Sequence, residues 1–189
     1  MQLRAPTVLR IAPGELRARA HARFGGELRQ AGSFAQLCML GAQACLDAAG
    51  GKRPLGVLWT SARGAALATR AALEDGLQPG APAMPFTFVA TQPHLAAALL
   101  AQRSHAIARS AFLYLAAGDW PWLARLAQAW LAECGQVLVG RVEESDAAGS
   151  AHQSDWCLFT NEPASPPDAP PGDSEFLDAL GLAVRALPR

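Results

Sequence analysis

The sequence predicts an α/β fold: a five-stranded, mostly parallel mixed sheet covered by helices on both faces. Strand-like and helix-like segments alternate along the chain, and this order favours parallel strands that are joined by helices. The 189 residues are 51% hydrophobic and include seven Phe and five Trp, which is enough apolar volume for one core. We therefore expect a three-layer α/β/α domain.

Five segments have the character of strands. The clearest is Gln-Val-Leu-Val-Gly at 136–140, and Leu-Gly-Val-Leu-Trp-Thr at 55–60 is typical of a buried strand. A short apolar run at 8–11 is ended by Pro13 and Gly14. The predicted strands are residues 8–11, 55–60, 106–113, 136–140 and 156–160.

Apolar residues at helical spacing predict the helices between these strands. Ser33 is a candidate N-cap of the first helix, Gly50 follows its end, and Asp119 with a proline two residues later marks the start of another helix. Three prolines between residues 82 and 93 predict extended or looped chain at 84–90. The predicted helices are residues 32–49, 65–77 and 94–102, the helix that begins near Asp119, and residues 174–187.

The end of the chain differs in composition from the rest. Five of the ten residues at 163–172 are Pro, a content that is typical of extended linkers. We therefore divide the chain into a domain at 1–162, a Pro-rich linker at 163–173 and an amphipathic C-terminal helix at 174–189. Two arrangements of that helix are open: packing on its own domain, or insertion into a groove of a partner.

Composition excludes several classes of function. The 16 basic and 16 acidic residues cancel, so no nucleic-acid footprint is indicated. Cys38, Cys45, Cys134 and Cys157 form no Cys-x-x-Cys pair, and we expect neither a metal site nor a cofactor. The first 30 residues lack the apolar segment of a signal peptide, and no run reaches the ~20 apolar residues of a membrane span. A cytoplasmic protein is expected.

Four short segments occur in an order that is informative. Residues 57–64 read Val-Leu-Trp-Thr-Ser-Ala-Arg-Gly, 84–88 Met-Pro-Phe-Thr-Phe, 91–96 Thr-Gln-Pro-His-Leu-Ala, and 138–143 Leu-Val-Gly-Arg-Val-Glu. In this order they resemble a strand with a Gly-containing turn, a Ser-Pro-x-x-Phe segment, a Val-x-Asn helix start and a Val-x-Gly-Gly-x-Glu strand end. Those segments belong to the N-terminal half of β-ketoacyl synthases, which have the thiolase-like fold. The resemblance covers most of residues 30–160 and implies five strands with the last one antiparallel.

In the family that this chain resembles, a nucleophilic cysteine begins the helix after the third strand, where the helix N-terminus lowers the thiol pKa. Tyr114, Leu115 and Ala116 stand at that place here, and none of them is suited to acyl transfer. Cys134 lies at the far end of the helix. We therefore predict no catalytic residue, a vacated nucleophile position at Tyr114, Leu115 and Ala116, and no condensation by this chain alone.

The family's second half, which carries two catalytic histidines and a lysine, has no counterpart in the 189 residues. The resemblance therefore points to the chain-length-factor branch, whose members keep the fold, lack the cysteine and work beside an active ketosynthase. It implies a non-catalytic component of a fatty-acid or polyketide-type pathway that dimerises with itself or with a ketosynthase. An acyl carrier protein is a further candidate partner.

Two sets of residues follow from the resemblance. The strand at 106–113 would pair with its twin across a two-fold axis, and aromatic residues around the old nucleophile would plug an acyl site or line it. We expect the plugged state, because nothing polar nearby would orient a thioester carbonyl. The dimer strand is Ala106, Ala108, Ser110 and Phe112, and the candidate pocket lining is Phe86, Phe88, His94, Phe112 and Trp120.

Two other functions stay open from the residues alone. One is a small acyl-transfer or hydrolase enzyme with an unrecognised nucleophile. His94, Ser110 and Asp119 are the residue types of a hydrolytic triad, but no Gly-x-Ser-x-Gly turn holds the serine. The other is a dimeric scaffold that is unrelated to acyl chains.

Overall fold

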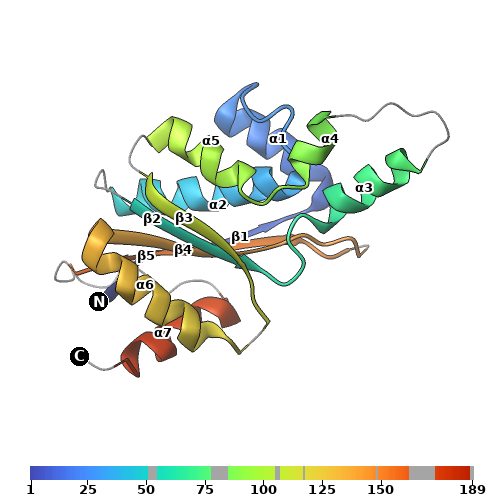
Figure 1. Ribbon diagram of the computed structural model, residues 1–189. Coiled ribbons are helices and arrows are strands. Elements are labelled where there is room, and N and C mark those ends of the chain that lie inside the picture. The colour runs from blue at the N-terminus through green and yellow to red at the C-terminus, as the bar shows by residue number, and fades with distance from the viewer. Residues whose placement is uncertain are drawn as a thin grey trace.

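Figure 1 shows three layers, with one five-stranded sheet between two layers of helices. The computed structural model describes residues 1–50, 55–77, 85–104, 107–116, 118–147, 149–161 and 173–187. The mixed α/β architecture predicted from the sequence is confirmed. The strands are β1 (Gln2–Ile11), β2 (Leu55–Ser61), β3 (Ile107–Tyr114), β4 (Gln136–Glu143) and β5 (His152–Thr160).

The strand order in the sheet is β1-β5-β4-β2-β3, so β1 and β3 are the edge strands. β2 is parallel to both β4 and β3, whereas β5 is antiparallel to both β4 and β1. Four strands therefore point in one direction and β5 alone points back, as the resemblance implied. The expectation of a mostly parallel sheet holds for the strand directions, but two of the four pairings are antiparallel.

The helices divide between the two faces of the sheet (Figure 1). One face carries α1 (Pro13–Phe24), α2 (Ser33–Ala49), α3 (Ala66–Gly76), α4 (Pro85–Ala90) and α5 (Leu95–Ser104). The other face carries α6 (Trp120–Cys134) and α7 (Glu175–Arg185). α2 is the central helix of the larger layer and packs on β1, β4 and β5.

Trp156 of β5 is fully buried under α2. Two glycines make room for its ring: a Cβ atom on Gly41 of α2 would lie 2.5 Å from Trp156 Cδ1, and one on Gly140 of β4 would lie 2.6 Å from Cε2. Trp156 Nε1 donates to Ser154 Oγ (2.8 Å), and that hydroxyl donates to the Leu37 carbonyl of α2 (3.0 Å). The indole is therefore held from both sides at the close packing typical of protein cores.

α7 packs on its own domain, against α6 and against β5 and β1. Its side chains Phe176, Leu177 and Leu180 are buried. Phe176 meets Trp120 of α6 edge-on, with 5.1 Å between the ring centroids. Of the two arrangements considered for this helix, the structure has the intramolecular one.

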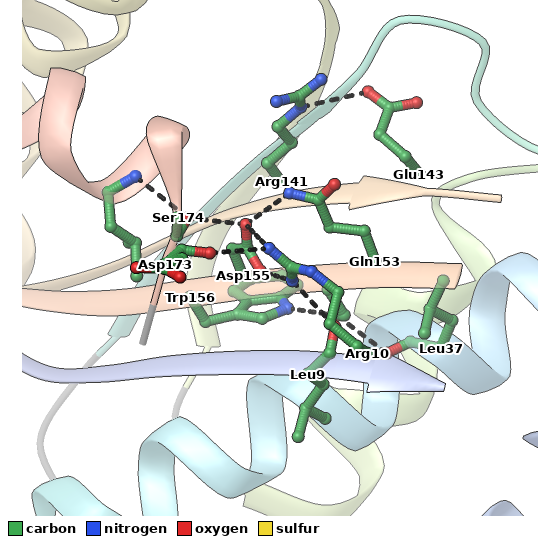
Figure 2. Close-up of polar contacts among 12 residues, drawn as sticks. Leu9, Arg10, Leu37, Arg141, Glu143, Gln153, Asp155, Trp156, Asp173 and Ser174 are labelled. Carbon is green, nitrogen blue, oxygen red and sulfur yellow. Dashed lines mark hydrogen bonds and ion pairs between the residues drawn. The ribbon is translucent and has the colours of Figure 1, made fainter. Parts of the chain in front are cut away.

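A buried carboxylate anchors the start of α7 (Figure 2). Asp155 of β5 accepts hydrogen bonds from the Arg10 guanidinium, from Gln153 Nε2 (2.6 Å) and from Ser174 Oγ (2.7 Å). Ser174 also caps α7, because its Oγ accepts from Leu177 N (3.3 Å). We call Asp155 with Arg10, Gln153 and Ser174 the Asp155 latch. The latch joins β1, β5 and α7, which lie far apart in the sequence.

Two segments that were not predicted as helices are helical. Pro13 is the first residue of α1. The first N–H groups of a helix have no acceptor within the helix, so a proline there costs no hydrogen bond. The apolar periodicity of α1 is weak in the sequence, because only Leu16, Ala20 and Phe24 of this helix are buried. Residues 84–90 were predicted to be extended or looped, but Pro85 begins the short helix α4. The prolines there mark a helix start and not an extended run.

The caps and ends of other elements also differ from the predictions. Gly32 is the N-cap of α2, and Ser33 Oγ instead donates to the Glu144 carboxylate. β5 begins at His152, four residues before the predicted start at 156. The Pro-rich linker, apart from Asp173, and Ala106 of the predicted dimer strand lie outside the described residues. Within the described ranges, no helix is long and apolar enough to cross a membrane.

Candidate functional site at the carboxyl edge of the sheet

The carboxyl ends of β2 and β3 form the place where a ligand site is expected in this topology. The connection from β2 to β3 runs over the face of α2, whereas the connection from β3 to β4 is α6 on the opposite face. Chains that leave adjacent strands toward opposite faces create a crevice, and open α/β sheets bind ligands there. Ser61 and Tyr114, the last residues of the two strands, are paired in the register.

Tyr114 lies at this edge of the sheet, at the end of β3. Its ring lies over Gly64, so that a Cβ atom on Gly64 would be 2.8 Å from the Tyr114 hydroxyl oxygen. Gly64 has φ +59°, a conformation that favours glycine, so this turn both needs the glycine and gives the tyrosine its space. The Tyr114 side chain is 66% exposed. It therefore covers the turn from the solvent side and is not a core residue.

Beneath Tyr114 lies a cluster of aromatic rings on the α2 face. Phe112 meets Tyr114 at 4.8 Å, Phe34 at 5.9 Å and Trp59 at 5.8 Å between ring centroids. Trp59 is fully buried and also meets the imidazole of His94 at 5.4 Å. The space behind the crevice is thus filled by side chains of β2, β3 and α2. Offset and edge-on contacts of this kind are favourable for aromatic pairs.

Of the five residues expected to line a pocket, the structure brings His94 and Phe112 together around Trp59. His94 and Phe112 both contact Trp59 and belong to the aromatic cluster. Phe88 is 66% exposed on α4, and the side chain of Phe86 lies outside the described part of the chain. Trp120 is on the opposite face of the sheet, against Phe176. The expectation for Trp120 was wrong because α6 crosses to the face opposite α2.

The predicted nucleophile position, Tyr114, Leu115 and Ala116, contains neither a thiol nor an aliphatic hydroxyl. Tyr114 ends β3, Leu115 packs toward the α6 and α7 core, and Ala116 is exposed. Asp119 is the N-cap of α6 but makes no side-chain capping hydrogen bond. Leu115 and Ala116 lie between the end of β3 and the N-cap of α6 and offer neither a thiol nor a hydroxyl.

The cysteines are poor nucleophiles in this fold. All four are free and buried. Burial raises the pKa of Cys45 to about 12 and raises the pKa values of Cys38, Cys134 and Cys157. The thiolate, which is the reactive form, is therefore scarce at neutral pH.

Ser61 and Glu143 form a polar contact at the same edge. Ser61 Oγ donates to Glu143 Oε2 (3.0 Å) and accepts from Gly64 N (2.8 Å), while Ala62 N donates to Glu143 Oε1 (2.8 Å). Figure 2 shows a further partner of this carboxylate, Arg141 Nε. These bonds shape the turn after β2. The group that accepts the Ser61 hydroxyl proton is the Glu143 carboxylate, and among the described residues no histidine is hydrogen-bonded to either residue.

The hydrolytic triad considered from the sequence is not assembled. Ser110 lies on the edge strand β3, His94 precedes α5 and contacts Trp59, and Asp119 lies at the start of α6. Sequence reasoning singled out neither Trp59 nor Glu143 as part of the site. Both lie in the segments 57–64 and 138–143, so the resemblance already contained the signal that these two strand ends meet.

The comparisons with known proteins agree with this fold. No family model and no curated protein matches the sequence. The structure is similar to the ketosynthase ApeO in complex with its chain length factor ApeC from Xenorhabdus doucetiae, with a TM-score of 0.62 and 13% identity over 85% of this chain and 79% of that chain. It is also similar to the ishigamide ketosynthase/chain length factor, with a TM-score of 0.59 and 14% identity over 77% of this chain and 48% of that chain. At these identities the likeness shows the fold, which is the thiolase-like fold of ketosynthases and chain length factors.

Proposed function

We propose that this chain is a non-catalytic, ketosynthase-like subunit of the chain-length-factor kind, which works beside an active ketosynthase in a fatty-acid or polyketide-type pathway. The observation that carries the proposal is the make-up of the turn after β3. Tyr114 lies over Gly64, and Tyr114, Leu115 and Ala116, at which the resemblance places the nucleophile, include no thiol and no aliphatic hydroxyl. The fold shared with ketosynthase and chain length factor structures supports the pathway assignment.

The two edges of the sheet favour association through β3. The outer edge of β1 is interrupted by Pro6, by a register shift between Arg4 and Thr7 and by the positive φ of Ala5 (48°), and such features protect an edge strand. The paired run of β3 from Arg109 to Tyr114 is regular and contains no proline. We therefore propose β3 as the strand that a partner, or a second copy, extends.

Several exposed apolar side chains belong to the neighbouring helices α3 and α4 and to the end of β3. Seven large hydrophobic residues of the described chain are exposed, and five of them are on α3, just after it, on α4 or at the end of β3. Exposed apolar side chains on neighbouring elements favour a protein partner there. The five are Leu73, Leu77, Phe88, Val89 and Tyr114.

The protein should form no covalent acyl intermediate. After incubation with an acyl thioester, intact-mass spectrometry is expected to show the unmodified chain, because residues 114–116 include no thiol or aliphatic hydroxyl and the four thiols are buried. An active ketosynthase treated in parallel is the positive control. An adduct on any residue from 110 to 120 would overturn the non-catalytic role. An adduct elsewhere would favour the enzymatic alternative.

Proline in β3 should weaken the dimer. Ala108→Pro or Ser110→Pro removes a backbone donor from the edge, so sedimentation or size-exclusion measurements are expected to shift toward monomer. Ala108→Ser and Ser110→Ala keep the donor and are the matched controls. The idea fails if the unmutated chain stays monomeric at every concentration, alone and with a ketosynthase from the same organism. Association without any effect on product formation would favour the scaffold function.

Tyr114 and Phe112 should differ in what they contribute. Phe112→Ala removes a ring that meets three others and is expected to lower the free energy of unfolding by about 3 kcal/mol. Tyr114 is mostly exposed, so Tyr114→Ala should cost only about 1 kcal/mol, the value of one aromatic contact. A plugged site predicts unchanged product length for both variants in reconstitution with a ketosynthase. A longer product from Tyr114→Ala would instead assign a gating role.

A further inference from the structure

α3 is attached to the molecule in a different way from the other long helices. None of its residues is buried, and Leu73, as well as Leu77 just after the helix, is exposed. α3 packs beside α4 and α2. Ala68 of α3 approaches the N-cap of α2 so closely that a Cβ atom added to Gly32 would lie 3.6 Å from the Ala68 Cβ. Burial of apolar surface, which holds α2 and α6, therefore contributes little to holding α3.

Polar contacts from the β4–β5 hairpin hold α3 instead. Glu144 is buried and its Oε2 accepts from Leu67 N in the first turn of α3 (3.2 Å), while Ser33 Oγ donates to the same carboxylate. A carboxylate at the N-terminus of a helix also interacts favourably with the helix dipole. The hairpin thus binds the beginning of the helix through a charge and a hydrogen bond.

A second carboxylate of the hairpin binds the next turn. Asp146 pairs with Arg70 of α3 (3.0 Å) and with Arg63 of the preceding turn (3.3 Å). Arg63 also donates to the backbone carbonyl of Glu144 (2.5 Å). Arg70 and Arg63 together lower the pKa of Asp146. We call Glu144 and Asp146, with Ser33, Arg63, Leu67 N and Arg70, the hairpin clasp.

We propose that α3 is an arm that opens as a unit separate from the sheet, and that the hairpin clasp sets how often it opens. Regions with few buried apolar contacts open at lower free energy than the core. The Arg63, Arg70 and Asp146 pairs are exposed, and exposed ion pairs are weak and are screened by salt. The opening of α3 therefore depends on ionic strength, whereas that of β2 and β4 does not.

The arm gives the proposed function a way to adapt to a partner. α3 carries Leu73 and is followed by Leu77 on the surface that we assign to the partner, so an opened arm can reposition these side chains when a ketosynthase binds. That consequence rests on the proposed function. The clasp does not, because it is made within one chain.

Hydrogen exchange of the intact protein, followed by mass spectrometry, tests the clasp. In Asp146→Asn and in Arg70→Gln, peptides covering 68–76 are expected to exchange roughly twofold to fivefold faster than in the unmutated chain. Peptides covering 136–143 should be unchanged. Sodium chloride at about 1 M should produce the same effect in the unmutated chain, since the Debye length falls to about 3 Å.

The matched control is Arg19→Gln, which removes an exposed ion pair with Glu15 on α1 and should leave 68–76 unchanged. The proposal is overturned if 68–76 exchanges as slowly as β4 in every variant and at every salt concentration, or if the variants accelerate exchange over the whole chain. Hydrogen exchange is measured here on this chain alone, with no ketosynthase present. A failure of the clasp is thus distinguishable from a failure to bind a ketosynthase.

Discussion

Gly140→Ala is expected to lower the free energy of unfolding by about 3 kcal/mol, which is at the upper end for overpacking a core. The added Cβ would lie 2.6 Å from Trp156 Cε2, and real Cβ atoms do not approach other atoms so closely. Trp156 cannot turn away easily, because Gly41 of α2 packs against its other side and its Nε1 donates to Ser154. For a chain of this length the melting temperature should fall by roughly 6–12 °C.

A double-mutant cycle checks the cause of this loss. Gly140→Ala combined with Trp156→Phe should cost less than the sum of the two single changes, because the smaller ring leaves room for the methyl group. Gly181→Ala is the control: a Cβ on this glycine of α7 would meet no atom within 4 Å, and alanine in a helix is favourable. Additive effects in the cycle, or a melting temperature of Gly140→Ala within about 2 °C of the unmutated chain, would contradict the packing account.

Asp155→Ala is expected to lower the free energy of unfolding by about 3 kcal/mol, since removing one partner of a buried ion pair leaves the other uncompensated. Arg10 loses both of its side-chain bonds to the carboxylate, and Ser174 loses one. Because Ser174 caps α7, hydrogen exchange should accelerate most in 175–185. This loss of stability is at the lower end of the range for buried ion pairs, because the Arg10 side chain is 37% exposed and its guanidinium can be hydrated after the carboxylate is removed.

Two further variants separate the parts of the Asp155 latch (Figure 2). Ser174→Ala should lower the free energy of unfolding by about 1 kcal/mol, which is the usual contribution of an N-cap side chain. Asp173→Ala is the control, because Arg10 donates to the backbone carbonyl of Asp173 and not to its side chain. The latch does not anchor the helix if the free energy of unfolding of Asp155→Ala lies within about 1 kcal/mol of that of the unmutated chain and α7 stays protected from hydrogen exchange.

The sequence was a good guide to the elements whose pattern is strong. β2 and β4 are buried on both faces, and this is why their apolar runs were recognisable. α6 and α7 present broad apolar faces at helical spacing, so they were found as well. α1 was missed because its buried face consists of three residues separated by arginines, and α4 was misread because a proline at a helix start looks like a break.

The candidate site was predicted in part. The residue types at Tyr114, Leu115 and Ala116 are known from the sequence alone, and their correspondence to a nucleophile position stays a prediction. The surroundings could not be read in this way. Trp120 and Phe112 lie eight positions apart, yet they face opposite sides of the sheet, because β3 ends between them and α6 crosses over.

Short-range patterns in the sequence were thus enough for the class of fold and for most strands and helices. The contacts that give each residue its role required the folded chain. Tyr114 over Gly64, Trp156 between Gly41 and Gly140, and Asp155 with Arg10 and Ser174 join segments from different elements. The physical reason is that periodicity and propensity act within a few residues, whereas burial, ion pairing and close packing depend on which distant segments become neighbours.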